Sequence, residues 1–161
     1  MGSGKSYWGK QWSSHFDLPL IDLDHEIETA AGKSIAEIFQ TKGEDGFRKM
    51  ERKTLHQFFR KDHYIMSCGG GTPCFFNNMK KMNRMGITIY LKSSPEIIAA
   101  RLKQEKENRP LIKGMDDDSL FSFISHKLED RRYAYAQSMY HFDTDFLHDD
   151  NFQRILRRHG S

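Results

Sequence analysis

Apolar positions recur along the chain in two different patterns, and these patterns separate predicted strands from predicted helices. Compact apolar runs of about four to eight residues are typical of buried strands, whereas an apolar residue every three or four positions predicts an amphipathic helix. The strands are predicted over 18–22, 63–67, 87–91 and 140–142. The helices are predicted over 5–16, a segment ending near 31, 34–43, 46–59, 76–85, 94–104, 119–137 and 151–159.

Several of these helices carry terminal signals in the sequence. Ser34 to Glu37 has the spacing of a capping box, and Ser94 followed by Pro95 is typical of a helix start. Gly32, Gly43 and Gly86 follow the last periodic residue of their segments, where glycine is the common C-terminal cap.

The alternation of strands and helices predicts the α/β class, a three-layer α/β/α arrangement around a mainly parallel sheet. The 161 residues suit a single domain, 1–161. Residues 105–118 have no period and are polar with proline and glycine, so we expect a loop with a function there, such as a lid.

Composition narrows the possible functions. The formal net charge of +3 is too small to predict nucleic-acid binding, and it is compatible with a small anionic ligand. The two cysteines, Cys68 and Cys74, are interpreted as reduced thiols of a cytosolic protein. No signal peptide and no apolar run near 18 residues is found, so neither secretion nor a membrane span is expected.

The residues at the start of the chain carry the first candidate chemistry. Gly4-Lys5-Ser6 matches the closing half of the phosphate-binding loop G-x-x-x-x-G-K-[ST]. In that loop backbone N–H groups surround phosphates, the lysine reaches the terminal phosphates and the hydroxyl binds Mg²⁺. A flexible N-terminal tail is the alternative reading of so short a match.

Further special residues follow the predicted strands, at the edge where ligands of parallel sheets collect. Asp22 and Asp24 come after the first strand, and one could orient the water shell of Mg²⁺ while the other accepts a proton. Alternatively, Asp24 caps the next helix. Gly69-Gly70-Gly71 follows the second strand and would allow a ligand to approach the backbone closely.

Taken together, these motifs resemble the shikimate kinase family. The resemblance runs from Gly2 almost to the C-terminus through IDLDHE, GFRKMER, SCGGGTP, GITIYLKSSPE, NRPLI and DRRYAY, in that order. It implies a P-loop kinase of the nucleoside-monophosphate-kinase type. It also implies a cytoplasmic, typically monomeric enzyme of aromatic amino-acid and chorismate biosynthesis, which transfers the γ-phosphoryl group of ATP to the 3-hydroxyl of shikimate with Mg²⁺.

On the nucleotide side, the resemblance implies that Lys5 contacts the β- and γ-phosphates and that Ser6 binds Mg²⁺, with Asp22 near the metal's water shell. Arg109 would belong to the lid and reach the transferring phosphate, and Arg101 would lie near the adenine. The phosphate-loop residues are Gly2, Ser3, Gly4, Lys5, Ser6 and Tyr7.

On the substrate side, the resemblance implies that Asp24 binds shikimate hydroxyls and accepts the proton. Arg48 would hold the shikimate carboxylate, with Arg131 as a second clamp, since a guanidinium pairs a carboxylate bidentately. Gly70 and its neighbours Gly69 and Gly71 would contact the ring. Lys5, Arg109 and Mg²⁺ would then neutralise the charge of the transferring group.

Two departures from the family pattern stand out. Tyr7 occupies a position that usually carries a small hydroxyl residue. The family's first strand and first loop glycine would fall before Met1, and without that strand two inner strand edges would be unpaired. Two alternatives therefore stay open: a weak or inactive shikimate-kinase-like binding protein, and a related small-molecule P-loop kinase such as a gluconate kinase.

Overall fold

The structure, a computed structural model, describes residues 2–104 and 112–159. The chain groups into two compact units, which we describe separately. Unit 1 comprises Met1–Gly4 and Ile87–Ser161, and unit 2 comprises Lys5–Gly86. The prediction of one domain over 1–161 stays a prediction.

Unit 2 contains two of the strands, which pair in parallel. Its elements are α1 (Lys5–Phe16), β1 (Leu20–Asp22), α2 (Leu23–Ala31), α3 (Ile35–Phe58), β2 (Ile65–Ser67), the short 3₁₀ helix η1 (Thr72–Cys74) and α4 (Asn78–Met85). Leu20 lies opposite Ile65 and Asp22 opposite Ser67, and α1 packs on both strands. Because the strands are parallel, the residues that follow them share one end of the pair.

The core of unit 2 lies where α2 packs against α3. The buried side chains of this cluster are Leu23, Ile27, Ile38, Phe47 and Leu55. Helix α3 is interrupted at Gly43, where φ is 65° and ψ is −176°, so it consists of two helical segments. The capping box at Ser34 and the left-handed cap at Gly32 are both present, which confirms these two predictions.

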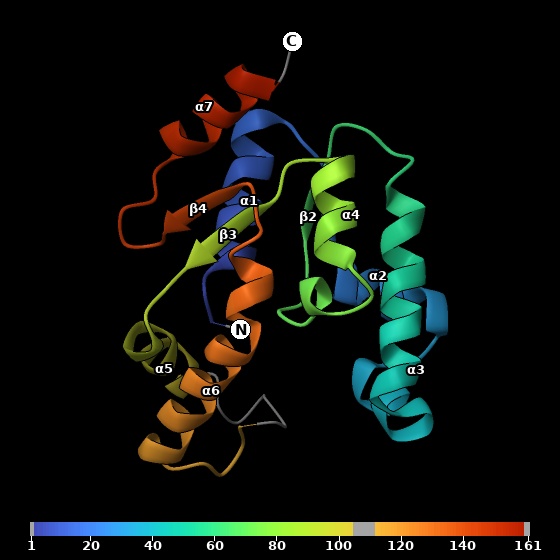
Figure 1. Cartoon of the computed structure of the whole chain (residues 1–161), viewed down its shortest axis with the longest axis vertical. Helices are drawn as coiled ribbons and strands as arrows, with labels where there is room; N and C mark the ends of the chain where they lie inside the picture. The colour runs from blue at the N-terminus through green and yellow to red at the C-terminus, as the bar shows by residue number, and fades with distance from the viewer. Residues whose placement is uncertain (1, 105–111, 160–161) are drawn as a thin grey trace. The chain divides into compact units, whose positions relative to one another are not determined.

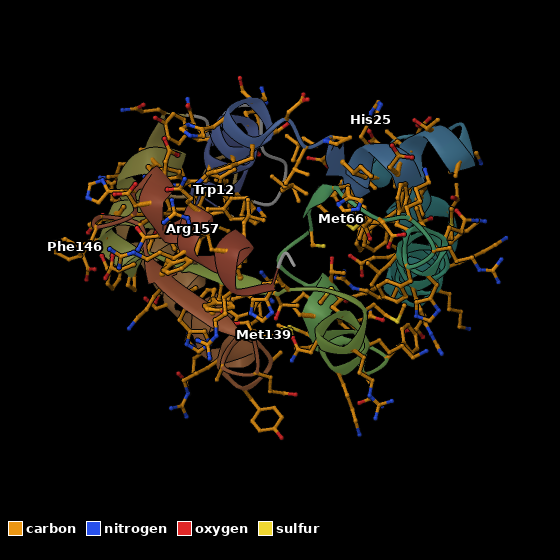
Figure 2. All side chains as sticks on the ribbon, turned by 90° about the horizontal axis from the view of Figure 1, so that it is seen from above. Trp12, His25, Met66, Met139, Phe146 and Arg157 are labelled. Carbon is orange, nitrogen blue, oxygen red and sulfur yellow. The ribbon has the colours of Figure 1, made fainter. Side chains whose placement is uncertain are left out.

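Unit 1 contains the second parallel strand pair. Its elements are β3 (Ile89–Lys92), α5 (Pro95–Lys103), α6 (Asp117–Tyr135), β4 (Tyr140–Asp143) and α7 (Asp149–His159). Strands β3 and β4 run side by side (Figure 1), with Ile89 opposite Tyr140. Helices α5 and α6 bury an apolar cluster of Ile98, Ala99, Leu102, Ile112, Leu120 and Ile124. Phe146, just after β4, points away from this unit (Figure 2).

The predicted element types are confirmed, whereas some boundaries and the pairing of the strands differ. Helix α6 begins at Asp117, because Asp116 caps it by accepting from the Ser119 N–H, so the predicted start at Ser119 is two residues late. The short helix η1 was not predicted. All described strand pairs are parallel, as expected, but they form two two-stranded sheets, β1–β2 and β3–β4, rather than one. Within residues 2–104 and 112–159, no helix is long and apolar enough to cross a membrane.

Candidate active site

The two aspartates after β1 have different local roles. The Asp22 carboxylate Oδ1 accepts from the backbone N–H groups of Asp24, at 3.0 Å, and His25, at 3.3 Å, so Asp22 is the N-cap of α2. The interpretation of Asp24 as the helix cap is therefore wrong, because Asp24 already lies inside the first turn of the helix. This arrangement leaves the Asp24 side chain available for chemistry.

Asp24 is a half-buried carboxyl group in an environment that favours its protonated form. Desolvation and then the nearby charges of Asp22 and Glu51 raise its pKa, and Lys5 partly opposes this shift. Its Oδ1 atom lies 3.3 Å from the point where a Cβ on Gly69 would be. A carboxylate with a raised pKa beside a glycine turn has the chemistry of a general base.

Arg48 is a buried cation with a fixed orientation. Its Nη1 donates to Glu51 Oε2 at 2.9 Å, and its Nη2 and Nε donate to Glu44 Oε1 at 3.2 and 3.3 Å. Its guanidinium carbon lies 4.3 Å from the centre of the Phe75 ring. Arg48 is 9% exposed and Glu51 is fully buried, so this pair sits in a low-dielectric site where charge is costly.

The glycine run comes close to these charged groups, while its predicted contact with a ligand stays a prediction. A Cβ on Gly71 would lie only 2.8 Å from the Arg48 Cζ, and a Cβ on Gly69 would lie 3.3 to 3.5 Å from Asp24, Thr72 and Glu51 oxygens. Glycine is therefore required at 71 for the observed position of the guanidinium.

Three residues that the sequence reasoning missed complete the surroundings of Arg48. Thr72 Oγ1 donates to Glu51 Oε1 at 2.6 Å, and Asn78 Nδ2 donates to the Thr72 carbonyl at 2.9 Å. The position of Glu51 three residues after Arg48 on a helix was a signal for an ion pair. No pattern in the sequence indicated Thr72, whose partner Glu51 is 21 residues away, or Asn78, whose partner is a backbone carbonyl.

The candidate phosphate loop is confirmed as a turn that opens a helix. Gly2 and Gly4 have φ values of 65° and 84°, which favour glycine, and Lys5 is the first residue of α1. The first turn of a helix offers N–H groups and a positive dipole end to anions. Tyr7 is 60% exposed and lies edge-on to Trp8, so its bulk is accommodated in this helix on the solvent side.

The donor set at the start of α1 fits a nucleotide with Mg²⁺. Lys5 offers an ammonium group and Ser6 an exposed hydroxyl, in the order that P-loop proteins use. Within the described ranges no three metal-binding side chains gather. That is compatible with Mg²⁺, which commonly binds through one or two protein groups and substrate phosphates.

The predicted arginines other than Arg48 are placed as follows. Arg101, on α5, donates from Nη1 to the Gly2 carbonyl at 3.3 Å and to Ser93 Oγ at 3.5 Å, all within unit 1. Arg131 lies on α6 in unit 1, whereas Arg48 belongs to unit 2, so the joint clamp stays a prediction. Arg109 and residues 105–111 of the predicted lid lie outside the described residues.

The cysteines take no visible part in this chemistry. Neither Cys68 nor Cys74 forms a disulfide with another described residue. Burial raises the pKa of the Cys68 thiol to about 12, so this thiol is protonated at neutral pH and is a poor nucleophile.

A glycine turn that opens a helix, followed by a parallel strand pair ending in carboxylates and glycines, defines a P-loop phosphotransferase. Comparison of the sequence with known protein families assigns the chain to one family within this class. The family model for shikimate kinase matches residues 1–159, and the chain belongs to the shikimate kinase family. It is accordingly an ATP-dependent kinase that uses Mg²⁺.

This chain covers most of the length of the proteins that it resembles. Shikimate kinase of Bacteroides thetaiotaomicron is 42% identical over 149 residues, which cover 92% of this chain and 85% of the relative. A crystal structure of shikimate kinase from that organism has a TM-score of 0.90 at 39% identity and covers 98% of this chain and 93% of its own. Shikimate kinase from Acinetobacter baumannii in complex with shikimate has a TM-score of 0.85 at 26% identity, covering 100% and 91%.

Proposed function

We propose that the residues at the carboxyl ends of β1 and β2 bind shikimate and that the chain transfers the γ-phosphoryl group of ATP to its 3-hydroxyl. The observation that carries this proposal is a buried guanidinium with unused donors in the same unit as a half-buried carboxyl group of raised pKa. Those two groups are Arg48 and Asp24. Together they match a small acid that also carries hydroxyl groups.

Arg48 is suited to hold the substrate carboxylate. A guanidinium has five N–H donors, and among the described residues three of them bind Glu44 and Glu51. Two N–H groups therefore remain for a carboxylate. The two glutamates and the Phe75 ring fix the plane of the guanidinium before the ligand arrives, which reduces the entropy that binding costs.

Asp24 would accept the proton of the attacking hydroxyl. A raised pKa makes the ionised carboxylate a stronger base, which improves proton transfer in the transition state. Gly69 lies directly beside this carboxylate, so a substrate ring could approach the backbone there.

Lys5 and Ser6 would bind the phosphates and the metal ion at the start of α1. When bound, Mg²⁺ supplies positive charge to the transferring phosphoryl group. The roles of Gly2, Ser3, Gly4 and Tyr7 as phosphate contacts, of Asp22 near the metal, and of Arg101, Arg109 and Arg131 belong to this proposal and rest on the family resemblance.

A coupled assay of ADP release tests the proposal. We expect turnover with shikimate and none above background with gluconate. Turnover with gluconate instead would favour the related-kinase alternative, and shikimate binding in calorimetry without turnover would favour the inactive binding protein. The Arg48→Ala variant should lose detectable shikimate binding while its ATP affinity stays within about twofold, since the two donors that Glu44 and Glu51 leave over would bind only the acid. Equal loss of both affinities would contradict the carboxylate role.

We further infer a monomeric enzyme of the cytoplasm. Support comes from the family resemblance, which implies a cytoplasmic and typically monomeric enzyme. Sedimentation of the purified chain at several concentrations would test the monomer.

A further inference from the structure

The orientation of Arg48 depends on Glu51, and both oxygens of Glu51 are engaged. Oε2 accepts from Arg48 at 2.9 Å and Oε1 accepts from the Thr72 hydroxyl at 2.6 Å. Glu51 is fully buried. A carboxylate held at one oxygen alone could rotate and move the guanidinium with it, so the hydroxyl of Thr72 determines where Glu51 presents its second oxygen.

Thr72 is itself held on its backbone. Its N–H donates to the Gly69 carbonyl at 3.1 Å, and its own carbonyl accepts from Asn78 Nδ2 at 2.9 Å. Thr72 and Asn78 are both fully buried. The first residue of η1 is thus connected to the first residue of α4 by a side-chain amide.

The amide of Asn78 lowers the stability of the folded chain at this position. Its Oδ1 atom is buried and has no hydrogen-bond partner among the described residues. A buried acceptor without a partner destabilises the folded chain, and an apolar side chain would avoid that cost. Turning the amide over would place Oδ1 against the Thr72 carbonyl, so the observed orientation is the one that satisfies the donor.

We propose that Thr72 and Asn78 are positioning residues for Arg48, acting through Glu51. Asn78 fixes the position of η1, and Thr72 fixes the position of the Glu51 carboxylate. Glu51 in turn orients the Arg48 guanidinium toward the space in front of Gly71. This rests on the proposed function only in that Arg48 is taken to hold the substrate acid. Neither Thr72 nor Asn78 needs to touch the substrate.

The first test compares Thr72→Val with Thr72→Ser. Valine keeps the shape and removes the hydroxyl, whereas serine keeps the hydroxyl. We expect Thr72→Val to raise the KM for shikimate about tenfold, because one hydrogen bond to a charged group is lost. The KM for ATP should change by less than about twofold, and Thr72→Ser should stay near the parent chain.

Thr41→Val is the matched control for loss of a threonine hydroxyl. Thr41 lies on α3, the helix that carries Arg48 and Glu51, but it is exposed and its hydroxyl donates to the Glu37 carbonyl of the same helix. Its kinetic constants should not change. An unchanged shikimate KM in Thr72→Val, an equal rise of both KM values, or a Thr72→Ser variant as impaired as Thr72→Val would overturn the proposal.

Asn78 is tested by a double-mutant cycle. If Asn78 acts through Thr72, the single substitution Asn78→Ala raises the KM for shikimate and not the KM for ATP. In a chain that already carries Thr72→Val, the same substitution raises the shikimate KM by a smaller factor. Fully additive effects would show that Asn78 acts independently of Thr72 and would overturn its role as a positioning residue for Arg48. Thermal unfolding of each variant accompanies the kinetics and identifies any chain that fails to fold.

A readout that needs no substrate separates this inference from the proposed function. The Arg48 Nε–H proton, which bonds to Glu44, should exchange with water faster in Thr72→Val than in Thr72→Ser, as followed by ¹⁵N NMR. If the parent chain does not phosphorylate shikimate, the proposed function fails, yet this difference still supports the positioning role. Equal exchange in the two variants overturns it.

Discussion

The two units have similar architectures but bury different kinds of polar contact. Each has one parallel strand pair and one apolar cluster, and each buries a polar contact beyond the ends of its strands. In unit 2 this contact is the ion pair of Arg48 and Glu51. In unit 1 it is a neutral pair, Ser93 Oγ and Thr144 Oγ1, 2.5 Å apart, at the ends of β3 and β4.

The two units differ in where their charged pairs lie, and only unit 2 has a buried pair among the described residues, at the cost of desolvating both charges. Unit 1 keeps its ion pairs in water, as in the pair of Lys103 and Asp117, whose side chains are about half exposed. Exposed pairs of this kind contribute little to stability, and buried pairs often contribute nothing net, so the buried pair of unit 2 is poorly explained by folding alone. A ligand that needs a fixed cation explains it better.

The strongest way to break this comparison is to displace the buried cation without removing it. Gly71 has a φ of −86°, which alanine adopts easily, so Gly71→Ala introduces only a steric conflict with the Arg48 guanidinium. We expect strain of about 1–3 kcal/mol at this point and a shikimate KM raised about 10- to 100-fold, with the ATP KM unchanged. Steady-state kinetics measures both constants.

Gly86→Ala provides the control for this substitution. A Cβ there meets no atom within 4 Å, and the φ of −178° suits any residue. If Gly71→Ala leaves the shikimate KM unchanged, or impairs ATP equally, the guanidinium does not hold the acid.

The second prediction tests the neutral pair of unit 1. Ser93→Ala removes a buried hydroxyl that bonds to Thr144 and accepts from Arg101. We expect the free energy of unfolding to fall by about 1–3 kcal/mol, because the remaining polar groups lose a partner, while the shikimate KM is unchanged. Urea unfolding and kinetics measure the two effects.

Ser122→Ala, an exposed position on α6 of the same unit, should leave stability within about 0.5 kcal/mol of the parent chain. A shikimate KM that rises with Ser93→Ala would remove the contrast between the two units.

The smallest expected effect concerns pH and Asp24. Its pKa in the folded chain is raised above the ordinary 3.8, so the folded form holds this proton more tightly than the unfolded form. The resulting stability is present below pH 3.8 and is lost as pH rises through the raised pKa. Asp24→Asn removes this loss and should make the chain more stable at pH 7, by at most about 1 kcal/mol or about 2–4 °C.

The same variant should lose turnover, because an amide cannot accept the proton. Thermal unfolding at pH 4 and pH 7 tests the stability effect: the advantage of Asp24→Asn should be larger at pH 7. An advantage that is larger at pH 4 would contradict the raised pKa.

Local patterns predicted most of the fold because they depend on neighbouring residues. The break at Gly43, the cap at Gly32 and the parallel pairing all followed from periodicity and glycine positions. The division of the strands into two pairs agrees with the two unpaired inner strand edges expected from the departure from the family pattern.

The site was predictable only where a motif carries its own chemistry. Aspartate is a good N-cap residue, so the sequence alone does not tell whether Asp22 or Asp24 caps α2. The extended backbone of Asp22, with φ −97° and ψ 114°, identifies Asp22 as the cap. The Thr72 to Glu51 bond joins residues 21 apart, and Asn78 acts on a backbone carbonyl. Such contacts leave no local pattern in the sequence.

The hydrogen bond from Arg101 to Gly2 has a consequence for the order of folding. It joins residues 99 positions apart, whereas unit 2 is one uninterrupted stretch of chain. During synthesis from the N-terminus, the Gly2 carbonyl is made long before its donor, and the whole of unit 2 emerges between them. Contacts that close short loops form sooner than contacts that close long ones. We therefore expect unit 2 to acquire its structure first, and the Gly2 carbonyl to be held only once α5 has been made.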